Sequence, residues 1–130
     1  MNATALPNAA TLLMRREVQK LFDELNGVTA VVVTTIDGYD VASATRGFVD
    51  PSRVAAMSSS IAAIGQVVSQ EAQIGPNRTM MIVTELGLAV FHRVHRADGE
   101  LIISVLARED AVLALVAHRT SQLAKMLTDA

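Results

Sequence analysis

Apolar and polar residues follow two patterns along the chain, one typical of helices and one typical of strands. Between residues 10 and 25, apolar side chains recur every three or four positions with charged side chains between them, and Asn26-Gly27 follows. Because glycine commonly stands just past the end of a helix, this segment predicts a surface helix with one buried stripe. The same spacing returns from about residue 109 to 127 and predicts a last helix there.

Runs rich in β-branched side chains predict five strands. Residues 28–36 are all Val, Ile or Thr except Ala30, and such stiff side chains favour strands over helices. Asp37-Gly38 is a strong hairpin signal that leads into a second strand at about 39–45. Three further strands separated by tight turns are expected at 78–84, 88–95 and 100–107.

A long uncharged segment lies between the second and third strands. Asp50-Pro51 supplies a helix N-cap followed by a first-turn proline, and the helix is expected to run to about Gln73. No charged residue occurs between Arg53 and Glu71. One stripe at helical spacing suits packing on a sheet. It consists of Val54, Met57, Ile61, Ile64 and Val68.

The predicted order of elements is α-β-β-α-β-β-β-α. Hairpin turns between consecutive strands imply antiparallel pairing, so we expect an α/β (α+β) sandwich, with a five-stranded antiparallel sheet and helices on both faces. Residues 1–9 are expected to form a flexible N-terminal tail and residues 10–130 a single domain. An apolar content of 51% is too high for a disordered chain.

The flank of the middle helix opposite its apolar stripe carries small or uncharged side chains, where a solvated helix would normally carry Lys and Glu. Small side chains let another backbone come close, and the following strand, 79–84, would invite pairing if it lay at a sheet edge. The alternative is that Ala and Ser are merely tolerated on a modestly polar exterior. We predict a homodimer interface that contains Ala55, Ser59, Ala62, Ala63, Gln66, Val67, Gln70, Met80 and Ile82.

Composition and charge exclude several classes of function. Eleven Lys and Arg against 13 Asp and Glu leave no basic excess for a phosphate backbone, and aromatic residues make up only 3%, so nucleic acid is not an expected partner. The absence of cysteine removes disulfides, thiolate nucleophiles and Cys-ligated metals. No signal peptide or membrane-spanning stretch is evident, so we expect a cytoplasmic protein without direct membrane insertion.

No catalytic, cofactor-binding or metal-binding constellation is apparent in the sequence. A P-loop is absent, so nucleotide hydrolysis by this chain is not expected. His92 and His95 are three positions apart in a predicted strand, where they would point to opposite faces and could not bind one metal. Arg93, His95 and Arg96 cluster beside a predicted hairpin; a solvated loop is the favoured interpretation and an acidic partner the alternative. We therefore expect no enzyme activity, no cofactor and no metal.

Several short motifs occur along residues 12–127 in a recognisable order. They are Leu25-Asn26-Gly27-Val28, Asp37-Gly38, the small-residue helix after Asp50 and the apolar strand 101–106 before the final helix. In this order they resemble the roadblock/dynein light chain domain family, and in particular its bacterial, small-GTPase-associated type. The resemblance implies this same sandwich, dimerisation through the middle helix and the strand after it, and a partner surface at about 50–73.

The resemblance also implies partners. Members of the family bind or regulate Ras-like small GTPases or act as scaffolding subunits, and some bacterial members are encoded near a sensor kinase. Ordinary surface positions, rather than arginine fingers, are expected for Arg46, Arg53, Arg78 and Arg93. We expect a non-catalytic homodimeric interaction module that binds a Ras-like small GTPase and modulates its nucleotide cycle or localisation. Two alternatives remain: a small-ligand sensor domain and a purely structural scaffold or adaptor subunit.

Overall fold

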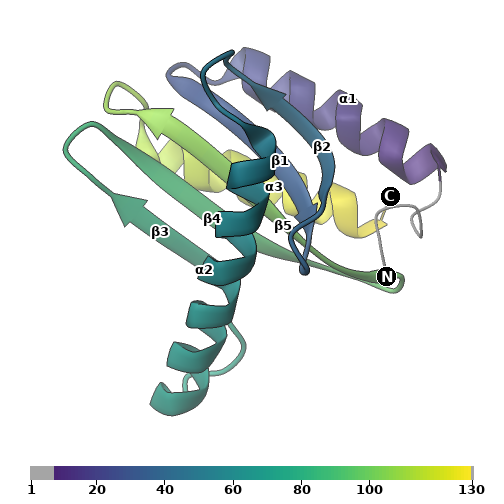
Figure 1. The fold of residues 1–130 in the computed structure, drawn as a ribbon, viewed down its shortest axis with the longest axis vertical. Helices are drawn as coiled ribbons and strands as arrows, with labels where there is room; N and C mark the ends of the chain where they lie inside the picture. The colour runs from purple at the N-terminus through teal and green to yellow at the C-terminus, as the bar shows by residue number, and fades with distance from the viewer. Residues whose placement is uncertain (1–7, 130) are drawn as a thin grey trace.

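The computed structural model describes residues 8–129, and its elements follow the predicted order (Figure 1). They are α1 (Asn8–Glu24), β1 (Val28–Thr35), β2 (Asp40–Thr45), α2 (Pro51–Ala72), β3 (Thr79–Val83), β4 (Gly87–Arg96), β5 (Gly99–Arg108) and α3 (Leu113–Asp129). Helix α1 begins at Asn8, so residues 8 and 9 are helical although they were expected in the tail; residues 1–7 lie outside the described range. Within residues 8–129, none of the helices combines the length and apolar character needed to cross a membrane.

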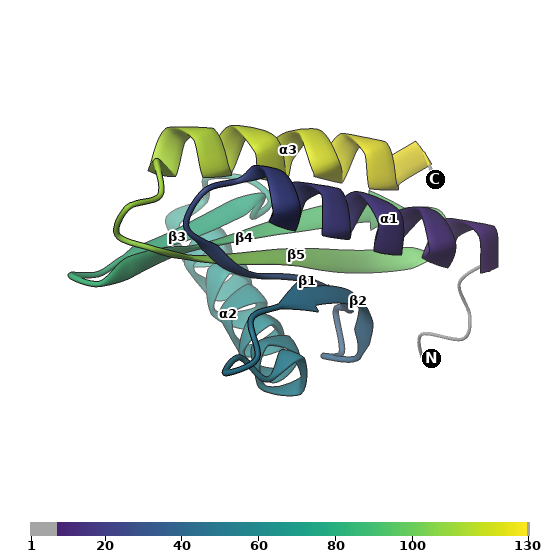
Figure 2. The ribbon, with the colours of Figure 1, turned by 90° about the horizontal axis from the view of Figure 1, so that it is seen from above.

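One antiparallel sheet of five strands, in the order β2-β1-β5-β4-β3, confirms the predicted fold class. Helices α1 and α3 cover one face and α2 covers the other, as Figure 2 shows. Strand β5 therefore lies at the centre, and β2 and β3 are the two edge strands. The last turns of α2 extend beyond the sheet (Figure 1).

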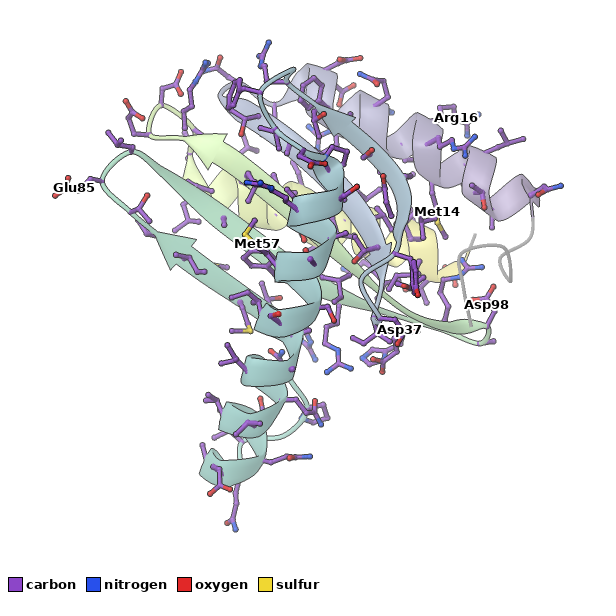
Figure 3. The ribbon with its side chains drawn as sticks, viewed as in Figure 1. Met14, Arg16, Asp37, Met57, Glu85 and Asp98 are labelled. Carbon is purple, nitrogen blue, oxygen red and sulfur yellow. The ribbon has the colours of Figure 1, made fainter. Side chains whose placement is uncertain are left out.

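The larger core lies between the sheet and the helices α1 and α3. Met14, Val18 and Leu127 are fully buried there against strand residues such as Val31 and Ile103. The side chain of Met14 points from α1 toward the sheet, whereas Arg16 points to solvent (Figure 3). This face follows the predicted helical stripes, because large aliphatic side chains supply most of the apolar area removed from water.

Helix α2 is capped at both ends by local hydrogen bonds. The Asp50 carboxylate accepts the backbone N–H of Ser52 over 3.0 Å and caps the N-terminus. At the other end, Gln73 has a left-handed conformation (φ 56°), and its N–H bonds to the carbonyl of Gln70. These caps fix the length of the helix and therefore which of its side chains reach the sheet.

Candidate partner-binding surface

The face of α2 that packs on the sheet carries small side chains. Its buried residues are Val54 and Ala55, followed at spacings of three or four positions by Ser58, Ala62, Gly65 and Ser69. The prediction that the large apolar stripe packs on the sheet is wrong for Met57, Ile64 and Val68, because these side chains are 50%, 55% and 55% exposed. Only Val54 of that stripe is buried, and Ile61 is partly buried.

Close approach explains why small residues occupy the inner face. A Cβ added at Gly65 would lie 2.3 Å from Nδ2 of Asn77 and 2.4 Å from Sδ of Met80. The backbone of α2 therefore lies closer to these two side chains than a larger residue at position 65 allows. The buried hydroxyls of Ser58 and Ser69 donate to carbonyls of the same helix, over 2.7 and 2.8 Å. Because these hydroxyls are satisfied within the helix, their burial leaves no unpaired donor.

Two of the residues predicted for an intermolecular interface are covered by this packing. Ala55 and Ala62 are only 1% and 6% exposed against the sheet of their own chain, so their assignment to the outer flank is wrong. Two others are half-buried and bonded internally: the Ser59 hydroxyl donates to the Ile36 carbonyl over 2.9 Å, and Gln66 accepts from Arg93.

The other five predicted interface residues differ in exposure. Ala63, Val67 and Gln70 are exposed on α2, as is Ile82 on β3. Met80 is half-buried and packs with Ala62 and Phe91. The intermolecular role of all nine positions stays a prediction.

An apolar surface remains uncovered on the outer side of α2 and on the neighbouring edge strand. We define this outer apolar surface as Met57, Ile64, Val67 and Val68 of α2 together with Ile82 of β3, which are each 40–58% exposed. Ile82 pairs with Ala89, which packs in the cluster beneath α2, so Ile82 faces the same side of the sheet as α2. A helix that is apolar on two sides is normally covered on both. Val67 lies on the outer side as predicted, whereas Met57, Ile64 and Val68 lie there instead of against the sheet.

Strand β3 has one partner strand and one free edge. It pairs with β4 alone, and none of its residues is charged. Met81 and Val83, on the side of the sheet opposite α2, are 50% and 65% exposed, because α1 and α3 cover the more central strands. An apolar edge without a charge or proline is open to pairing with another strand. The structure thus confirms that this strand lies at an edge.

The described residues hold no group of three or more His, Cys, Asp or Glu that could bind a metal. His92 is buried at 8% exposure, with Nδ1 2.7 Å from the Thr79 hydroxyl oxygen. His95 lies beside Glu100 at 3.0 Å and is exposed. The two rings therefore have separate surroundings, as the strand spacing predicted.

The interpretation of the arginine cluster as a solvated loop is wrong, since these residues lie within β4. The Arg93 side chain is 14% exposed and bonds to Gln66 over 2.9 Å and to Glu100. The Arg96 side chain is 5% exposed and pairs with Asp98 over 2.8 Å. Burial of the Glu100 carboxyl raises its pKa, but the Arg93 guanidinium and the His95 ring beside it have the larger combined effect. Together they lower the pKa of Glu100.

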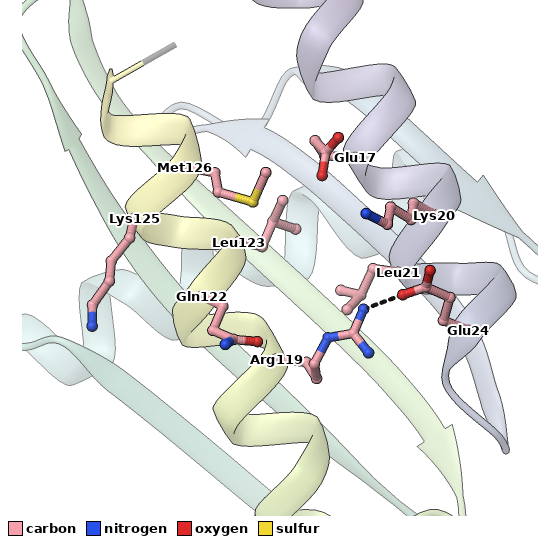
Figure 4. A pocket seen from close by; sticks show the side chains of 9 residues that line it. All are labelled: Glu17, Lys20, Leu21, Glu24, Arg119, Gln122, Leu123, Lys125 and Met126. Carbon is pink, nitrogen blue, oxygen red and sulfur yellow. Dashed lines mark hydrogen bonds and ion pairs between the residues drawn. The ribbon is translucent and has the colours of Figure 1, made fainter.

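A groove of about 610 Å³ separates α1 from α3 (Figure 4). Leu21, Leu123 and Met126 supply its apolar lining, and an ion pair between Glu24 and Arg119 spans it. Its other lining side chains are polar or carry charges of both signs, and none is aromatic. Small-molecule sites usually combine an apolar, often aromatic wall with a few convergent polar groups, so this groove gives little support to the small-ligand alternative.

Comparisons with known proteins bear on the fold. No protein-family model and no curated protein matches the chain. Among solved structures, a Roadblock/LC7 domain from Streptomyces avermitilis aligns with a TM-score of 0.77 at 17% identity, covering 87% of this chain and 92% of that one. MglB from Myxococcus xanthus aligns with a TM-score of 0.83 at 14% identity, covering 95% and 91%. The gliding protein MglB from Thermus thermophilus gives 0.81 at 12% identity, covering 95% and 92%.

These structural alignments extend over 87–95% of this chain. The fold of the structure agrees with the fold that the sequence motifs imply. The chain has the roadblock/LC7 fold.

Proposed function

We propose that the protein is a non-catalytic homodimeric module that binds a Ras-like small GTPase and modulates its nucleotide cycle or localisation. The observation that carries this proposal is the outer apolar surface beside the free edge of β3. The likeness to MglB and to a Roadblock/LC7 domain adds support through the fold. A chain without cysteine suits a reducing compartment, and a cytoplasmic location is part of the proposal. Nothing in residues 8–129 points to a sensor kinase.

Two exposed features on one side of the molecule support the proposed dimer. Antiparallel pairing of two β3 strands would join two five-stranded sheets and satisfy the free backbone groups of both edges. Because α2 lies on the same face as Ile82, this pairing would also bring the two outer apolar surfaces toward each other. A stable interface buries about 800 Å² on each partner, and half-exposed Met, Ile and Val side chains supply much of what that requires.

In this proposal the chemistry belongs to the GTPase, and this chain supplies no catalytic side chain. Arg93 is held by Gln66 and Glu100 and is not free to enter a nucleotide site. Arg46 stacks over the Phe22 ring at 5.6 Å, on the face that carries α1. We therefore expect any change in GTP hydrolysis or exchange to arise from repositioned GTPase loops rather than from a donated arginine.

Two measurements test the proposal. Sedimentation equilibrium should show a dimer, and Val68→Asp should dissociate it because the change places a charge on the apolar surface. Leu12→Asp, at a residue 63% exposed on α1, is the matched control and should leave the dimer intact.

Titration with a Ras-like GTPase from the same genome, in its GDP and GTP-analogue forms, should show binding that differs between the two forms. A monomer with no affinity for either form would refute the proposal. Binding without any change in hydrolysis or exchange rates would favour the adaptor alternative. Stabilisation by metabolites, with no GTPase binding, would favour the ligand-sensor alternative.

A further inference from the structure

A cavity of about 500 Å³ lies where β4 extends past the start of β3. The β3–β4 register ends at the pair Thr79 and His92, so residues 94–96 of β4 pair with β5 alone. The α3 helix lies over β4 (Figure 2), and the second half of α3 and residues 76–78 before β3 complete the lining. Three separate segments therefore form one concave site.

The lining of this cavity is basic. Half of its lining residues are Arg, Lys or His, and none is acidic. The basic members are Arg78, His92, Arg93, His95 and Lys125, and the others are Pro76, Asn77, Ser121, Ala124 and Thr128. This concentration differs from the chain as a whole, which carries a net charge of −2.

Two of the cations are not neutralised by a neighbour. Arg93 and His95 share Glu100, which offsets part of their charge. Arg78 and Lys125 have no ion-pair partner among residues 8–129. Positive charges that line a concave surface without compensation favour an anionic ligand.

His92 adds a buried hydrogen-bonding group to the cavity. Its side chain is one of the lining groups although the residue is only 8% exposed, and its Nδ1 is engaged by the Thr79 hydroxyl. Nε2 has no hydrogen bond within the described chain. When the Thr79 hydroxyl donates to Nδ1, the ring proton resides on Nε2, which then donates to a ligand oxygen. Burial and the nearby charge of Arg78 lower the pKa of His92, so this neutral donor form persists near neutral pH.

Two further lining groups, Ser121 and Asn77, have side chains without a hydrogen-bond partner in this part of the chain. The cavity thus offers two free cations and several donors. A carboxylate carries one charge and would leave a cation unmatched, whereas a phosphate monoester carries about 1.5 to 2 negative charges at pH 7 and three strong acceptor oxygens. Its volume also exceeds that of a phosphate group and leaves room for the remainder of a small molecule.

We propose that this cavity binds the phosphate group of a small phosphomonoester, with Arg78 and Lys125 supplying charge and His92 and Ser121 supplying hydrogen bonds. The site differs from the outer apolar surface, with which it shares no residue. The proposal does not rest on the proposed GTPase binding. A phosphorylated metabolite is thus a ligand class separate from the protein partner.

Isothermal titration and NMR of the His92 ring test this proposal on the full chain. The probes are inorganic phosphate and glycerol 3-phosphate, with acetate and sodium chloride at matched ionic strength as controls. We expect saturable binding of one glycerol 3-phosphate per chain and a shift of the His92 Nε2 resonance. Arg78→Gln and Lys125→Gln should each weaken binding about tenfold, because each removes a charge-assisted contact.

The matched control is Arg16→Gln, at a side chain 74% exposed on α1, and it should leave the affinity unchanged. Thermal unfolding should confirm that all three variants are folded. Non-saturable titration by both phosphate probes would overturn the proposal, as would acetate binding of equal strength. Binding of inorganic phosphate alone would also overturn it, because the site would then not accommodate an ester. An equal loss in Arg16→Gln would show that the effect arises from net charge.

Discussion

Gly87 provides a direct test of how closely the start of β4 approaches β5. It is the first residue of β4, and its carbonyl accepts the backbone N–H of Thr84 over 2.9 Å and the Thr84 hydroxyl over 3.0 Å. A Cβ added there would lie 2.3 Å from the carbonyl oxygen of Ala107, although ordinary contacts begin at 3.4 Å. The obstructing atom belongs to the backbone of β5, which is held on both sides by β1 and β4 and cannot move aside.

For Gly87→Ala these contacts predict a net loss of stability. Overpacking of this kind costs about 1–3 kcal/mol. The smaller conformational freedom of alanine in the unfolded chain offsets about 0.4–1 kcal/mol. We therefore expect the free energy of unfolding to fall by about 1–2 kcal/mol. Because self-association is proposed, the variants should be compared at one protein concentration by urea unfolding followed by circular dichroism.

Gly47→Ala is the matched control, because an added Cβ there meets nothing within 4 Å and Gly47 has no positive φ. It should be neutral or slightly stabilising, with an unchanged dependence on urea. The reasoning would be refuted if Gly87→Ala kept the stability of the unmodified chain, or if both variants lost the same amount. The comparison separates the effect of space at β5 from the general effect of removing a glycine.

Three further predictions concern α2 and the buried histidine. Asp50→Ala should lower the free energy of unfolding by about 1 kcal/mol, since it removes the acceptor for Ser52 N–H, and Asp50→Asn should retain most of it; thermal unfolding measures both. Burial and the nearby charge of Arg78 hold the pKa of His92 below 6.5, so the unfolded chain binds more protons than the folded chain at mildly acidic pH. The free energy of unfolding should therefore fall as the pH drops below 6.5. Urea unfolding at several pH values should show a smaller pH dependence for His92→Gln. Ile64→Ala should weaken dimerisation roughly 30-fold, because it removes about 1 kcal/mol of apolar burial from each of two copies, whereas Leu12→Ala should not; sedimentation equilibrium decides.

The sequence was sufficient to predict the five strands and their order along the chain. The β-branched run at 28–36 and the Asp37-Gly38 turn are strong local signals, and both correspond to observed structure: β1 and the turn into β2. The start of the last helix was less predictable. Ala111 N–H bonds to the Arg108 carbonyl in a turn, so α3 begins at Leu113 rather than near residue 109. Local patterns determine element type more firmly than element boundaries.

The orientation of α2 could not be read from hydropathy. Hydropathy gives no weight to the close approach at Gly65, nor to a serine hydroxyl that bonds to its own helix, as Ser58 does. Large side chains such as Ile64 lie on the solvent-facing side of the helix, where the amphipathic pattern of a monomeric protein would place polar residues. The basic cavity escaped prediction for a different reason, since its lining comes from segments between residues 76 and 128 that meet only in the folded chain.

The two edge strands of the sheet differ in ways that would limit how many molecules can associate through strand pairing. Strand β2, at the border opposite β3, exposes Asp40 and Ser43, and its register with β1 is interrupted between Val33 and Thr34. Charges and irregular register discourage strand addition. If two molecules associate through their β3 borders, both outermost strands of the resulting ten-stranded array are copies of β2. In that case growth would end at a closed pair, without indefinite polymerisation into fibres.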